Sequence, residues 1–226
     1  MLTECIILAG GLGTRLKSVS GETPKPLVGV SGTPFVYYIM DNLVEQGIEH
    51  IIFAVSYRSD FFIHEIGSTY KGARVSYSVE TEPMGTGGAI KLALKHCQSR
   101  YVAVTNGDTY LDIDLQGFYQ QHITGHNPLS MALVSVEDVS RYGSVILDGV
   151  HITGFSEKGL VGEGYINGGL YLLSVPEITL PDGAFSFEEK ILKQNYESID
   201  PFLCTGFFID IGIPSDYFRA CSKFEK

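Results

Sequence analysis

Short apolar runs separated by longer segments of helical periodicity dominate the first half of the chain. The runs rich in β-branched and other apolar residues are Cys5–Ala9, His50–Val55, Val75–Val79 and Tyr101–Thr105. Runs of this length and composition predict buried strands. Because helical patterns lie between them, this half predicts a parallel sheet covered by helices.

Two of the helical segments have recognisable ends. The first is predicted at Phe35–Gln46, with Pro34 at its first position and Gly47 just past its end. Proline suits the first turn of a helix and glycine suits the position that follows the last turn. The second helix is predicted at Gly85–His96.

The alternation of short apolar runs with helical segments ends at about Leu129. Strands are predicted at Met131–Val136, Tyr165–Leu173 and Phe202–Asp210, with a turn-rich stretch up to Ser156. A short helix is predicted at Phe185–Leu192 and a final one at Pro214–Phe224. This half therefore predicts mixed or antiparallel strands added to the parallel sheet of the first half.

The chain has 226 residues, without repeats, linkers or low-complexity tracts. This length suits one mixed α/β domain. We expect a single Rossmann-like α/β domain over residues 1–226, with a central, mostly parallel mixed sheet flanked by helices and a small antiparallel extension. Its two halves are expected at about 1–128 and 129–226.

Charge and composition restrict the partners. The formal net charge is −10, which argues against nucleic acid because binding a phosphate backbone requires clustered Lys and Arg. An acidic small ligand must therefore meet a local basic pocket. The apolar run at the N-terminus is too short for a signal peptide, and no segment is long enough to span a bilayer. We expect a cytoplasmic protein with no membrane partner.

The cysteines are scattered along the chain, at Cys5, Cys97, Cys204 and Cys221. They lack Cys-x-x-Cys spacing and neighbouring histidines, which argues against a zinc site. We expect reduced thiols in the core.

The strongest chemical signal is the glycine-rich segment Leu8–Leu16, directly after the first predicted strand. Glycines allow backbone N–H groups to close around phosphate oxygens, and Arg15 would add positive charge. A Walker A loop is excluded because no Gly-Lys-Ser/Thr follows. An NAD-binding fingerprint is disfavoured because Leu16 stands where a third glycine is needed and the second strand lacks an acidic residue after it. A plain glycine-rich turn is the remaining alternative.

Two further segments support a phosphate and metal site. Lys25 lies between Pro24 and Pro26, which stiffen the backbone and let the ammonium meet a phosphate at little entropic cost. Asp108 follows the fourth predicted strand, at the carboxyl end of a parallel sheet, where ligands usually bind. A carboxylate there suits Mg²⁺, although an aspartate after a strand is often only a turn residue.

Together, the glycine-rich loop and the Thr23–Leu27 segment resemble the signature of the nucleotidyltransferases that activate sugar 1-phosphates. Other segments are similar to later motifs of that family. These are a base-binding loop at Glu82–Ala89, a sugar-site pair at Glu157–Lys158, a sugar-binding strand at Tyr165–Tyr171 and a second metal segment at Phe208–Pro214.

The resemblance implies a site for each substrate. The catalytic residues would be Arg15 and Lys25, and the ligands of Mg²⁺ would be Asp108 and Asp210. The nucleotide-binding residues would be Leu8, Ala9, Gly10, Gly11, Gly13, Thr14, Arg15, Glu80, Gly85, Thr86, Asn106 and Gly107. The sugar-phosphate-binding residues would be Gly143, Glu157, Lys158, Asn167 and Gly168. Without the family resemblance, Glu157–Lys158 would be interpreted as a solvated ion pair, and the glycines near Asn167 would be interpreted as a bulge in a core strand.

Within that family the chain looks most like guanylyltransferases acting on D-glycero-α-D-manno-heptose 1-phosphate. This similarity rests on the sequence of Glu82–Ile90 and on the Phe-Ser-Phe-Glu segment at Phe185–Glu188. It implies GTP and the heptose phosphate as substrates, and GDP-heptose for bacterial surface polysaccharide as product. Uridylyltransferases for N-acetylmuramic acid 1-phosphate and mannose-1-phosphate guanylyltransferases share much of the pattern. Family members often form dimers, so a homo-oligomer is also an expectation.

Some residues depart from the family pattern. Ile213 stands where Thr is common, Phe208 where Trp is common, and Gly159 where Pro follows the Glu-Lys pair. None of these changes removes a charged group, but they affect the expected sugar recognition. A non-catalytic sensor of nucleotide sugars is a separate hypothesis, disfavoured because Lys25, Asp108 and Asp210 are all retained.

Overall fold

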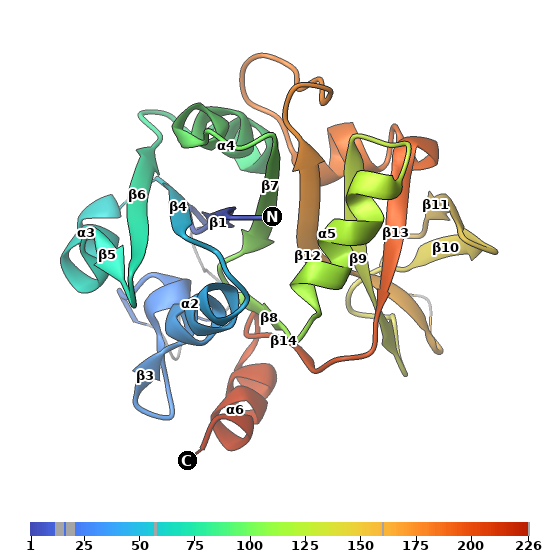
Figure 1. Cartoon of the computed structure of the whole chain (residues 1–226). Coiled ribbons are helices and arrows are strands. Elements are labelled where there is room, and N and C mark those ends of the chain that lie inside the picture. The colour runs from blue at the N-terminus through green and yellow to red at the C-terminus, as the bar shows by residue number, and fades with distance from the viewer. Residues whose placement is uncertain (12–15, 17–20, 57, 160, 226) are drawn as a thin grey trace.

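The computed structural model describes residues 1–11, 16, 21–56, 58–159 and 161–225 (Figure 1). The helices and helical turns are η2 (Lys25–Leu27), α2 (Phe35–Glu45), α3 (Ser59–Ile66), α4 (Gly85–Ala93), η3 (Leu94–His96), α5 (Leu115–Thr124), the π-helical η4 (Glu188–Leu192), η5 (Tyr196–Ser198) and α6 (Pro214–Lys223). The strands are β1 (Glu4–Leu8), β2 (Gly29–Val30), β3 (Thr33–Pro34), β4 (His50–Val55), β5 (Thr69–Tyr70), β6 (Ala73–Val79), β7 (Tyr101–Asn106), β8 (Thr109–Leu111), β9 (Leu129–Val136), β10 (Val145–Asp148), β11 (His151–Phe155), β12 (Gly164–Ser174), β13 (Ile199–Cys204) and β14 (Phe208–Asp210).

A mixed sheet runs through the part of the chain that the structure describes, with ten strands in all. Strands β7, β1, β4 and β6 lie side by side and run parallel, as the first half predicts. Strand β12 then runs antiparallel to β7 on one side and to β9 on the other. The hairpin β10–β11 and the edge strand β5 add further antiparallel pairs.

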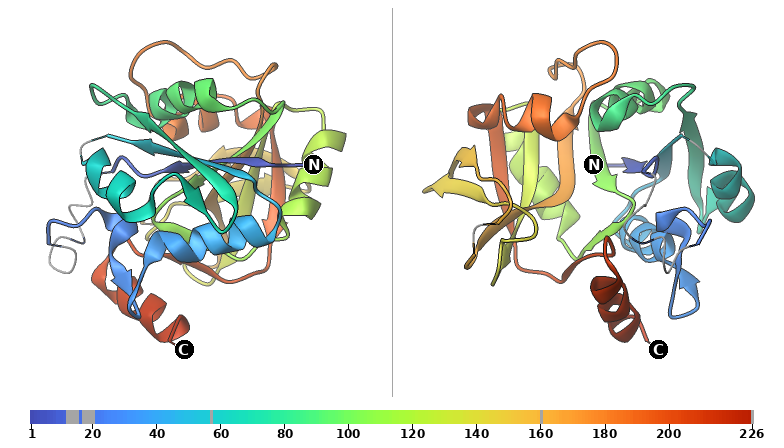
Figure 2. Two further views of the ribbon diagram at one scale, coloured as in Figure 1. Left: turned by 60° about the vertical axis from the view of Figure 1, so that its left-hand side comes forward. Right: turned by 180° about the vertical axis from the view of Figure 1, so that it is seen from behind.

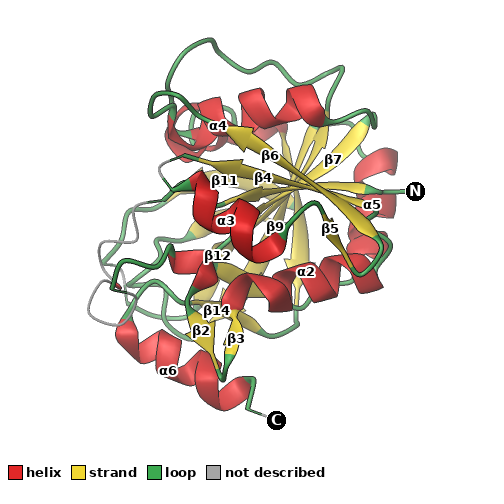
Figure 3. Ribbon diagram, turned by 90° about the vertical axis from the view of Figure 1, so that its left-hand side faces the viewer, coloured by secondary structure: helices red, strands yellow, loops and turns green. Residues whose placement is uncertain are grey.

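The alternation of side chains along each strand divides the core between the two faces of the sheet. On β1, Cys5 and Ile7 belong to a buried cluster that also contains residues of α2, α3, α5 and α6. Ile6 points the other way, into a cluster that contains α4 and η4. In Figure 3 α4 accordingly lies on the opposite side of the fanned sheet from α2, α3 and α6.

Most predicted elements agree with the structure to within a few residues. Helix α2 ends at Glu45 and is followed by Gly47 with a φ of +95°. Pro34 is the residue before the first helical turn, one position earlier than predicted. The second predicted helix is α4 extended by the 3₁₀ turn η3.

Three predictions for the second half need correction. The strand predicted at Phe202–Asp210 is two strands, β13 and β14, that belong to different sheets. The turn-rich stretch before Ser156 contains the hairpin β10–β11. The helix predicted from Phe185 is only the π-helical turn η4, because the residues before it have irregular backbone that is hydrogen-bonded to the start of α4.

The four cysteines are free, as predicted. Cys5 and Cys204 are buried, whereas Cys97 and Cys221 are only half-buried, so the expectation of core thiols is met by two of the four. None of the helices formed by the described residues combines the length and the apolar character that crossing a lipid bilayer requires.

Candidate active site

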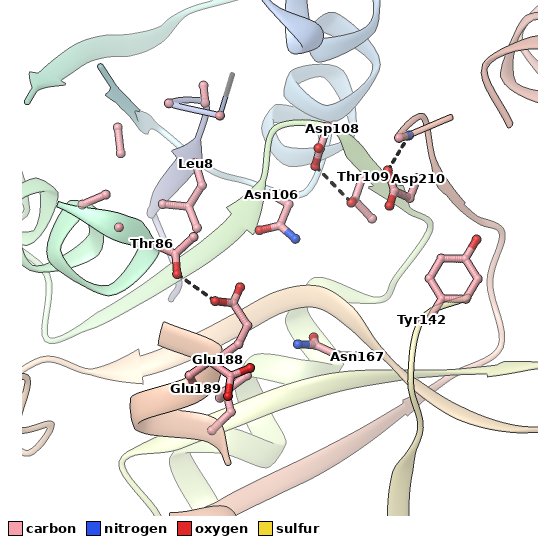
Figure 4. A pocket seen from close by; sticks show the side chains of 18 of the residues that line it. Leu8, Thr86, Asn106, Asp108, Thr109, Tyr142, Asn167, Glu188, Glu189 and Asp210 are labelled. Atoms are coloured by element: carbon pink, nitrogen blue, oxygen red, sulfur yellow. Dashed lines mark hydrogen bonds between the residues drawn. The ribbon is translucent and has the colours of Figure 1, made fainter. Parts of the chain in front are cut away.

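A large cavity opens where β1, β6 and β7 end and continues along β12 and η4 (Figure 4). Its volume is about 1170 Å³, above the range of about 300–1000 Å³ typical for one small ligand. Of the predicted site residues, those lining it are Leu8, Ala9, Gly10, Gly11, Lys25, Glu80, Gly85, Thr86, Asn106, Asp108, Gly143, Glu157, Lys158, Asn167 and Asp210. Segments more than two hundred positions apart in the sequence therefore meet in one cavity.

The remaining predicted residues are not on the cavity wall. Gly13, Thr14 and Arg15 lie outside the described residues. Gly107 and Gly168 are buried behind the wall. A Cβ on Gly107 would lie 2.9 Å from the Leu8 carbonyl oxygen, and one on Gly168 would lie 3.1 Å from the Ala132 oxygen. Both glycines allow strands to pack closely against each other.

At the centre of the cavity two carboxylates converge on one ammonium. Lys25 Nζ donates to Asp108 Oδ2 at 2.5 Å and to Asp210 Oδ1 at 3.1 Å. The Lys25 side chain is only 10% exposed, whereas those of Asp108 and Asp210 are 35% and 30% exposed. The lysine is therefore held under the carboxylates, which keep part of their surface towards the cavity.

The backbone explains why residues 108 and 210 meet. Strand β14 pairs with β8 so that Asp210 lies opposite Thr109, and the Ile211 amide donates to the Asp108 carbonyl at 3.0 Å. Asp210 Oδ1 also accepts the Gly212 amide at 2.7 Å, which fixes the direction of its side chain. Figure 4 shows both carboxylates on the same side of the cavity.

This donor set fits a divalent metal. The Asp108 and Asp210 carboxylates lie close enough to contact the same ammonium group, so they can also bind one hard ion such as Mg²⁺. This ion usually takes one or two carboxylates from a protein and completes its coordination shell with phosphate and water. Among the described residues no cluster of three or more His, Cys, Asp or Glu offers an all-protein metal cage.

One end of the cavity is formed by the loop between β6 and α4. Glu80 follows β6, and its Oε2 accepts the Met84 amide at 3.3 Å. Burial raises the pKa of Glu80, and the Met84 hydrogen bond offsets part of that increase. Gly85 begins α4 with a φ of +67°, a backbone conformation that glycine adopts at little cost. A carboxylate and several backbone groups thus face this end of the cavity.

The other end combines charged side chains with a strand bulge. Glu157 Oε1 accepts from Lys193 Nζ at 2.8 Å, and Lys193 also pairs with Glu189 at 2.8 Å. Hydrogen bonds to Glu157 and Glu189 raise the pKa of Lys193 to about 12, and the hydrogen bond from Lys193 lowers the pKa of Glu157. Lys193 and Glu157 are therefore charged at neutral pH and present both signs to a polar ligand.

Asn167 and Gly143 also shape this end. The register of β12 against β9 shifts between Asn167 and Tyr171. There the Asn167 amide donates to Tyr171 Oη at 2.7 Å and accepts from the Gly169 amide at 2.9 Å. Gly143 has a φ of +78°, and a Cβ there would lie 2.8 Å from the Ser156 oxygen. The loop before β10 thus packs directly on the segment that carries Glu157 and Lys158.

Several cavity residues were not predicted from the sequence, among them Thr109, Tyr142, Ser144, Glu188, Glu189 and Lys193. Glu188 belongs to the Phe185–Glu188 segment, which the sequence marked as distinctive without a place in the site. Nothing in the sequence indicated that Glu189 and Lys193 belong to a site, because charged residues on or near a short helix usually indicate only a solvent-exposed face.

Comparison with known proteins agrees with this geometry. The chain is 39% identical over 221 residues to a D-glycero-alpha-D-manno-heptose 1-phosphate guanylyltransferase of Aneurinibacillus thermoaerophilus, covering 96% of each chain. It is 40% identical over 222 residues to the protein of the same name from Campylobacter jejuni, covering 96% of this chain and 97% of the other.

Solved structures give the same result. HddC from Yersinia pseudotuberculosis superposes with a TM-score of 0.90 and 44% identity, covering 99% of this chain and 100% of that one. A structure of that protein complexed with GMP-PN superposes with a TM-score of 0.89 at the same identity and coverage. The model of the nucleotidyl transferase family matches residues 4–226. This chain belongs to the nucleotidyl transferase family and is a sugar-1-phosphate nucleotidyltransferase.

Proposed function

We propose that the protein transfers GMP from GTP to D-glycero-α-D-manno-heptose 1-phosphate, giving GDP-heptose and pyrophosphate. The observation that carries the proposal is the Lys25–Asp108–Asp210 cluster at the centre of a cavity of about 1170 Å³. Polar groups suited to a base lie on one side of the cluster, and groups suited to a sugar phosphate lie on the other. The relatives that carry this name, at 39% and 40% identity over nearly the whole chain, support both substrates.

Glu80 supports guanine as the base. Guanine presents N–H donors on its Watson–Crick edge, including the N2 amino group, and a carboxylate accepts from such donors. Glu80 is a carboxylate at the base end of the cavity, beside the exposed backbone of Gly85. The complex of the Yersinia protein with GMP-PN is in line with this choice of base.

At the sugar end we propose that Glu157 and Asn167 bind sugar hydroxyls and that Lys158 binds the sugar phosphate. Lys193 keeps Glu157 ionised, and the bulge in β12 fixes the Asn167 amide. An ionised carboxylate accepts hydroxyl donors strongly, and the amide can offer both a donor and an acceptor. This combination suits a polyhydroxylated ligand.

The proposed reaction needs no general base. A sugar phosphate has a second pKa near ~6, so at neutral pH its oxygen is already a nucleophile. That oxygen forms a bond to the α-phosphorus of GTP, and the bond from the α-phosphorus to the bridging oxygen of pyrophosphate breaks. The protein has to align the two polyanions and neutralise their charge.

Basic side chains and a metal are proposed to provide this alignment. Lys25 and Lys158 bring positive charge to the phosphates, and Arg15 is proposed to join them from the glycine-rich loop. Asp108 and Asp210 would hold Mg²⁺, which supplies charge neutralisation and orientation at the triphosphate. We also propose that the reaction takes place in the cytoplasm.

A panel assay tests the proposal. Purified protein is incubated with Mg²⁺, each of the four common nucleoside triphosphates in turn, and the 1-phosphates of the manno-heptose, mannose and N-acetylmuramic acid, while pyrophosphate release is followed. We expect release with GTP and the heptose phosphate at a kcat/KM well above that of every other pair. A preference for GTP with mannose 1-phosphate, or for UTP with the muramic acid phosphate, would replace the substrates and keep the reaction. If no pair of substrates gave pyrophosphate release, a non-catalytic sensor of nucleotide sugars would be favoured.

A further inference from the structure

The glycine-rich start of α4 is covered by a segment from far along the chain. We call residues 183–188, which lead into η4, the strap. Figure 2 shows this orange segment passing over α4. The Phe185 amide donates to the Met84 carbonyl at 2.9 Å, and the Gly87 amide donates to the Phe185 carbonyl at 3.0 Å. The strap is therefore hydrogen-bonded to the base loop on both sides of Gly85.

The glycines in this stretch make room for the strap. A Cβ on Gly85 would lie 2.5 Å from the Phe185 oxygen, one on Gly87 would lie 2.0 Å from the Phe185 ring, and one on Gly88 would lie 3.0 Å from the Gly183 oxygen. Of these three glycines, only Gly85 lines the cavity. The close approach of the strap thus largely explains why glycines occupy the Gly-Thr-Gly-Gly sequence at residues 85–88.

Glu188 and Thr86 fasten the strap at its end. Thr86 Oγ1 donates to Glu188 Oε2 at 2.7 Å and accepts the Phe187 amide at 2.8 Å. The same Glu188 oxygen accepts from Ser186 Oγ at 3.0 Å. Figure 4 shows the Glu188 side chain directed at Thr86. The Thr86 hydroxyl is therefore engaged by the strap as both donor and acceptor.

The position of this contact gives it a functional consequence. Phe187 anchors the strap in the core, with its ring 5.2 Å from that of Tyr171. Beyond Glu188, the same helical turn carries Glu189, and Lys193 follows it and pairs with Glu157. A rigid connection thus runs from the core to the first turn of α4, where the nucleotide end of the cavity lies.

We propose that Glu188 is a positioning residue of the nucleotide site. Through its hydrogen bond with Thr86 it fixes the first turn of α4 and the loop from Glu80 to Gly85 in the geometry that receives the nucleoside triphosphate. This inference rests on the proposed function, and it gives Thr86 the task of holding the loop. The Phe185–Glu188 segment, distinctive in the sequence, thereby acquires a role in nucleotide binding.

Paired substitutions test the proposal. Glu188→Ala and Thr86→Val each remove the contact, whereas Glu188→Gln keeps an acceptor and Thr86→Ser keeps the hydroxyl. The probes are GTP turnover with heptose 1-phosphate and calorimetric binding of a non-hydrolysable GTP analogue with Mg²⁺. Loss of one partly buried hydrogen bond to a carboxyl group predicts that Glu188→Ala and Thr86→Val raise the KM for GTP and the Kd of the analogue about 5- to 20-fold.

Further expected results separate positioning from other roles. At saturating substrates kcat changes less than about threefold, since the chemistry is untouched. The double variant Thr86→Val/Glu188→Ala resembles either single variant, because the two residues act through one contact. Glu188→Gln and Thr86→Ser remain within about threefold of the wild-type KM.

Lys91→Met is the matched control. Lys91 also ties the segment after β12 to α4, donating to the carbonyls of Leu180 and Pro181 and to Asp182, but it does not line the cavity. We expect this variant to lose some thermal stability and to keep the wild-type KM for GTP. An equal rise of KM in Lys91→Met would mean that the contact at Glu188 is merely structural, and would overturn the proposal.

Other outcomes also decide the matter. An unchanged KM for GTP in folded Glu188→Ala would overturn the proposal. It would also be overturned if the effects of Thr86→Val and Glu188→Ala on KM were additive and Glu188→Gln were as impaired as Glu188→Ala. That pattern would indicate that Glu188 contacts the substrate directly. Should Glu188→Ala not fold, the Thr86→Val and Thr86→Ser pair makes the same comparison. Failure of the proposed function is distinct, because the wild-type protein would then neither bind the analogue nor release pyrophosphate.

Discussion

Lys25 has the least freedom of the charged residues that meet at the cavity centre. Its side chain is 10% exposed and donates to two carboxylates, which hold the ammonium in place. A preorganised charge of this kind stabilises a developing charge without reorganisation. The sequence indicated the lysine from its neighbouring prolines, but its contact with both aspartates depends on the fold.

Lys25→Ala is expected to lower kcat with GTP and heptose 1-phosphate by about 10²–10³-fold, the usual effect of losing one preorganised contact to a transition state. Initial rates of pyrophosphate release at saturating substrates measure this. Lys95→Ala, which removes an exposed lysine beyond α4, should match the wild type. A loss under threefold in Lys25→Ala would remove this lysine from the reaction.

Asp108→Ala and Asp210→Ala are each expected to reduce turnover almost to the level of buffer, because each removes one of the two carboxylates proposed to hold Mg²⁺. Addition of EDTA to the wild type should have the same effect, and excess Mg²⁺ should reverse it. Circular dichroism checks that the variants fold, and Asp148→Ala, at an exposed position on β10, serves as the control. Full activity in both cavity variants would contradict the metal assignment.

At the scale of elements, the strands β1, β4 and β7 of the parallel half were predictable because they are buried on both faces and form continuous apolar runs. The segment Phe202–Asp210 was not. A Cβ on Gly206 would lie 1.8 Å from the Asp112 oxygen, and at this point the chain leaves β9 to pair with β8 instead. Local hydrophobicity cannot reveal such a change of partner, yet it brings Asp210 to Asp108.

The first strand is fixed at its start by a buried acid. Glu4 is 4% exposed; its Oε1 lies 2.8 Å from His50 Nδ1, and its Oε2 accepts the amides of Gln98 and Ser99 at 2.8 and 2.6 Å. Burial alone would raise the pKa of Glu4, but these hydrogen bonds outweigh it and lower the pKa from its ordinary value of 4.5. β1 is thereby joined to β4 and to the turn before β7.

Glu4→Gln is expected to destabilise the protein by about 1–3 kcal/mol at pH 7, the cost of weakening a buried charge-assisted network. Because the folded-state pKa is lowered, the stability from ionised Glu4 is present above pH 4.5 and lost as the pH falls through the folded-state value. The difference in free energy of unfolding between wild type and variant should therefore shrink below pH 4.5. Urea titrations across that range measure it, with the exposed Glu49→Gln as control; a constant difference would contradict the argument.

At the scale of the whole molecule, the cavity is built from both halves of the chain. Lys25 and Glu80 come from the parallel half, whereas Lys158, Asn167, Lys193 and Asp210 come from the second half. The sequence motifs named most of these residues because each motif is local. Lys193 and Glu189 could not be found in that way, since only the path of the strap and η4 brings them to the cavity. The net charge of −10 predicts a local basic pocket for an acidic substrate, but the described residues that line the cavity at this junction include three lysines and seven acidic residues. We therefore expect a bound metal to contribute much of the positive charge that the phosphates need.

A ligand that spans this junction should stabilise the entire fold. Binding only to the folded state at a concentration of 100 times Kd adds about 2.7 kcal/mol, which for a chain of 226 residues corresponds to a rise of roughly 5–11 °C in Tm. We expect a rise of this size with Mg²⁺ and a non-hydrolysable GTP analogue together, and a shift under about 2 °C with Mg²⁺ alone, because the protein offers the metal only two carboxylates. Scanning calorimetry with the analogue in EDTA gives the remaining comparison. A full shift from the metal alone would contradict a site completed by the phosphates, since the fold would then bind the ion without the nucleotide.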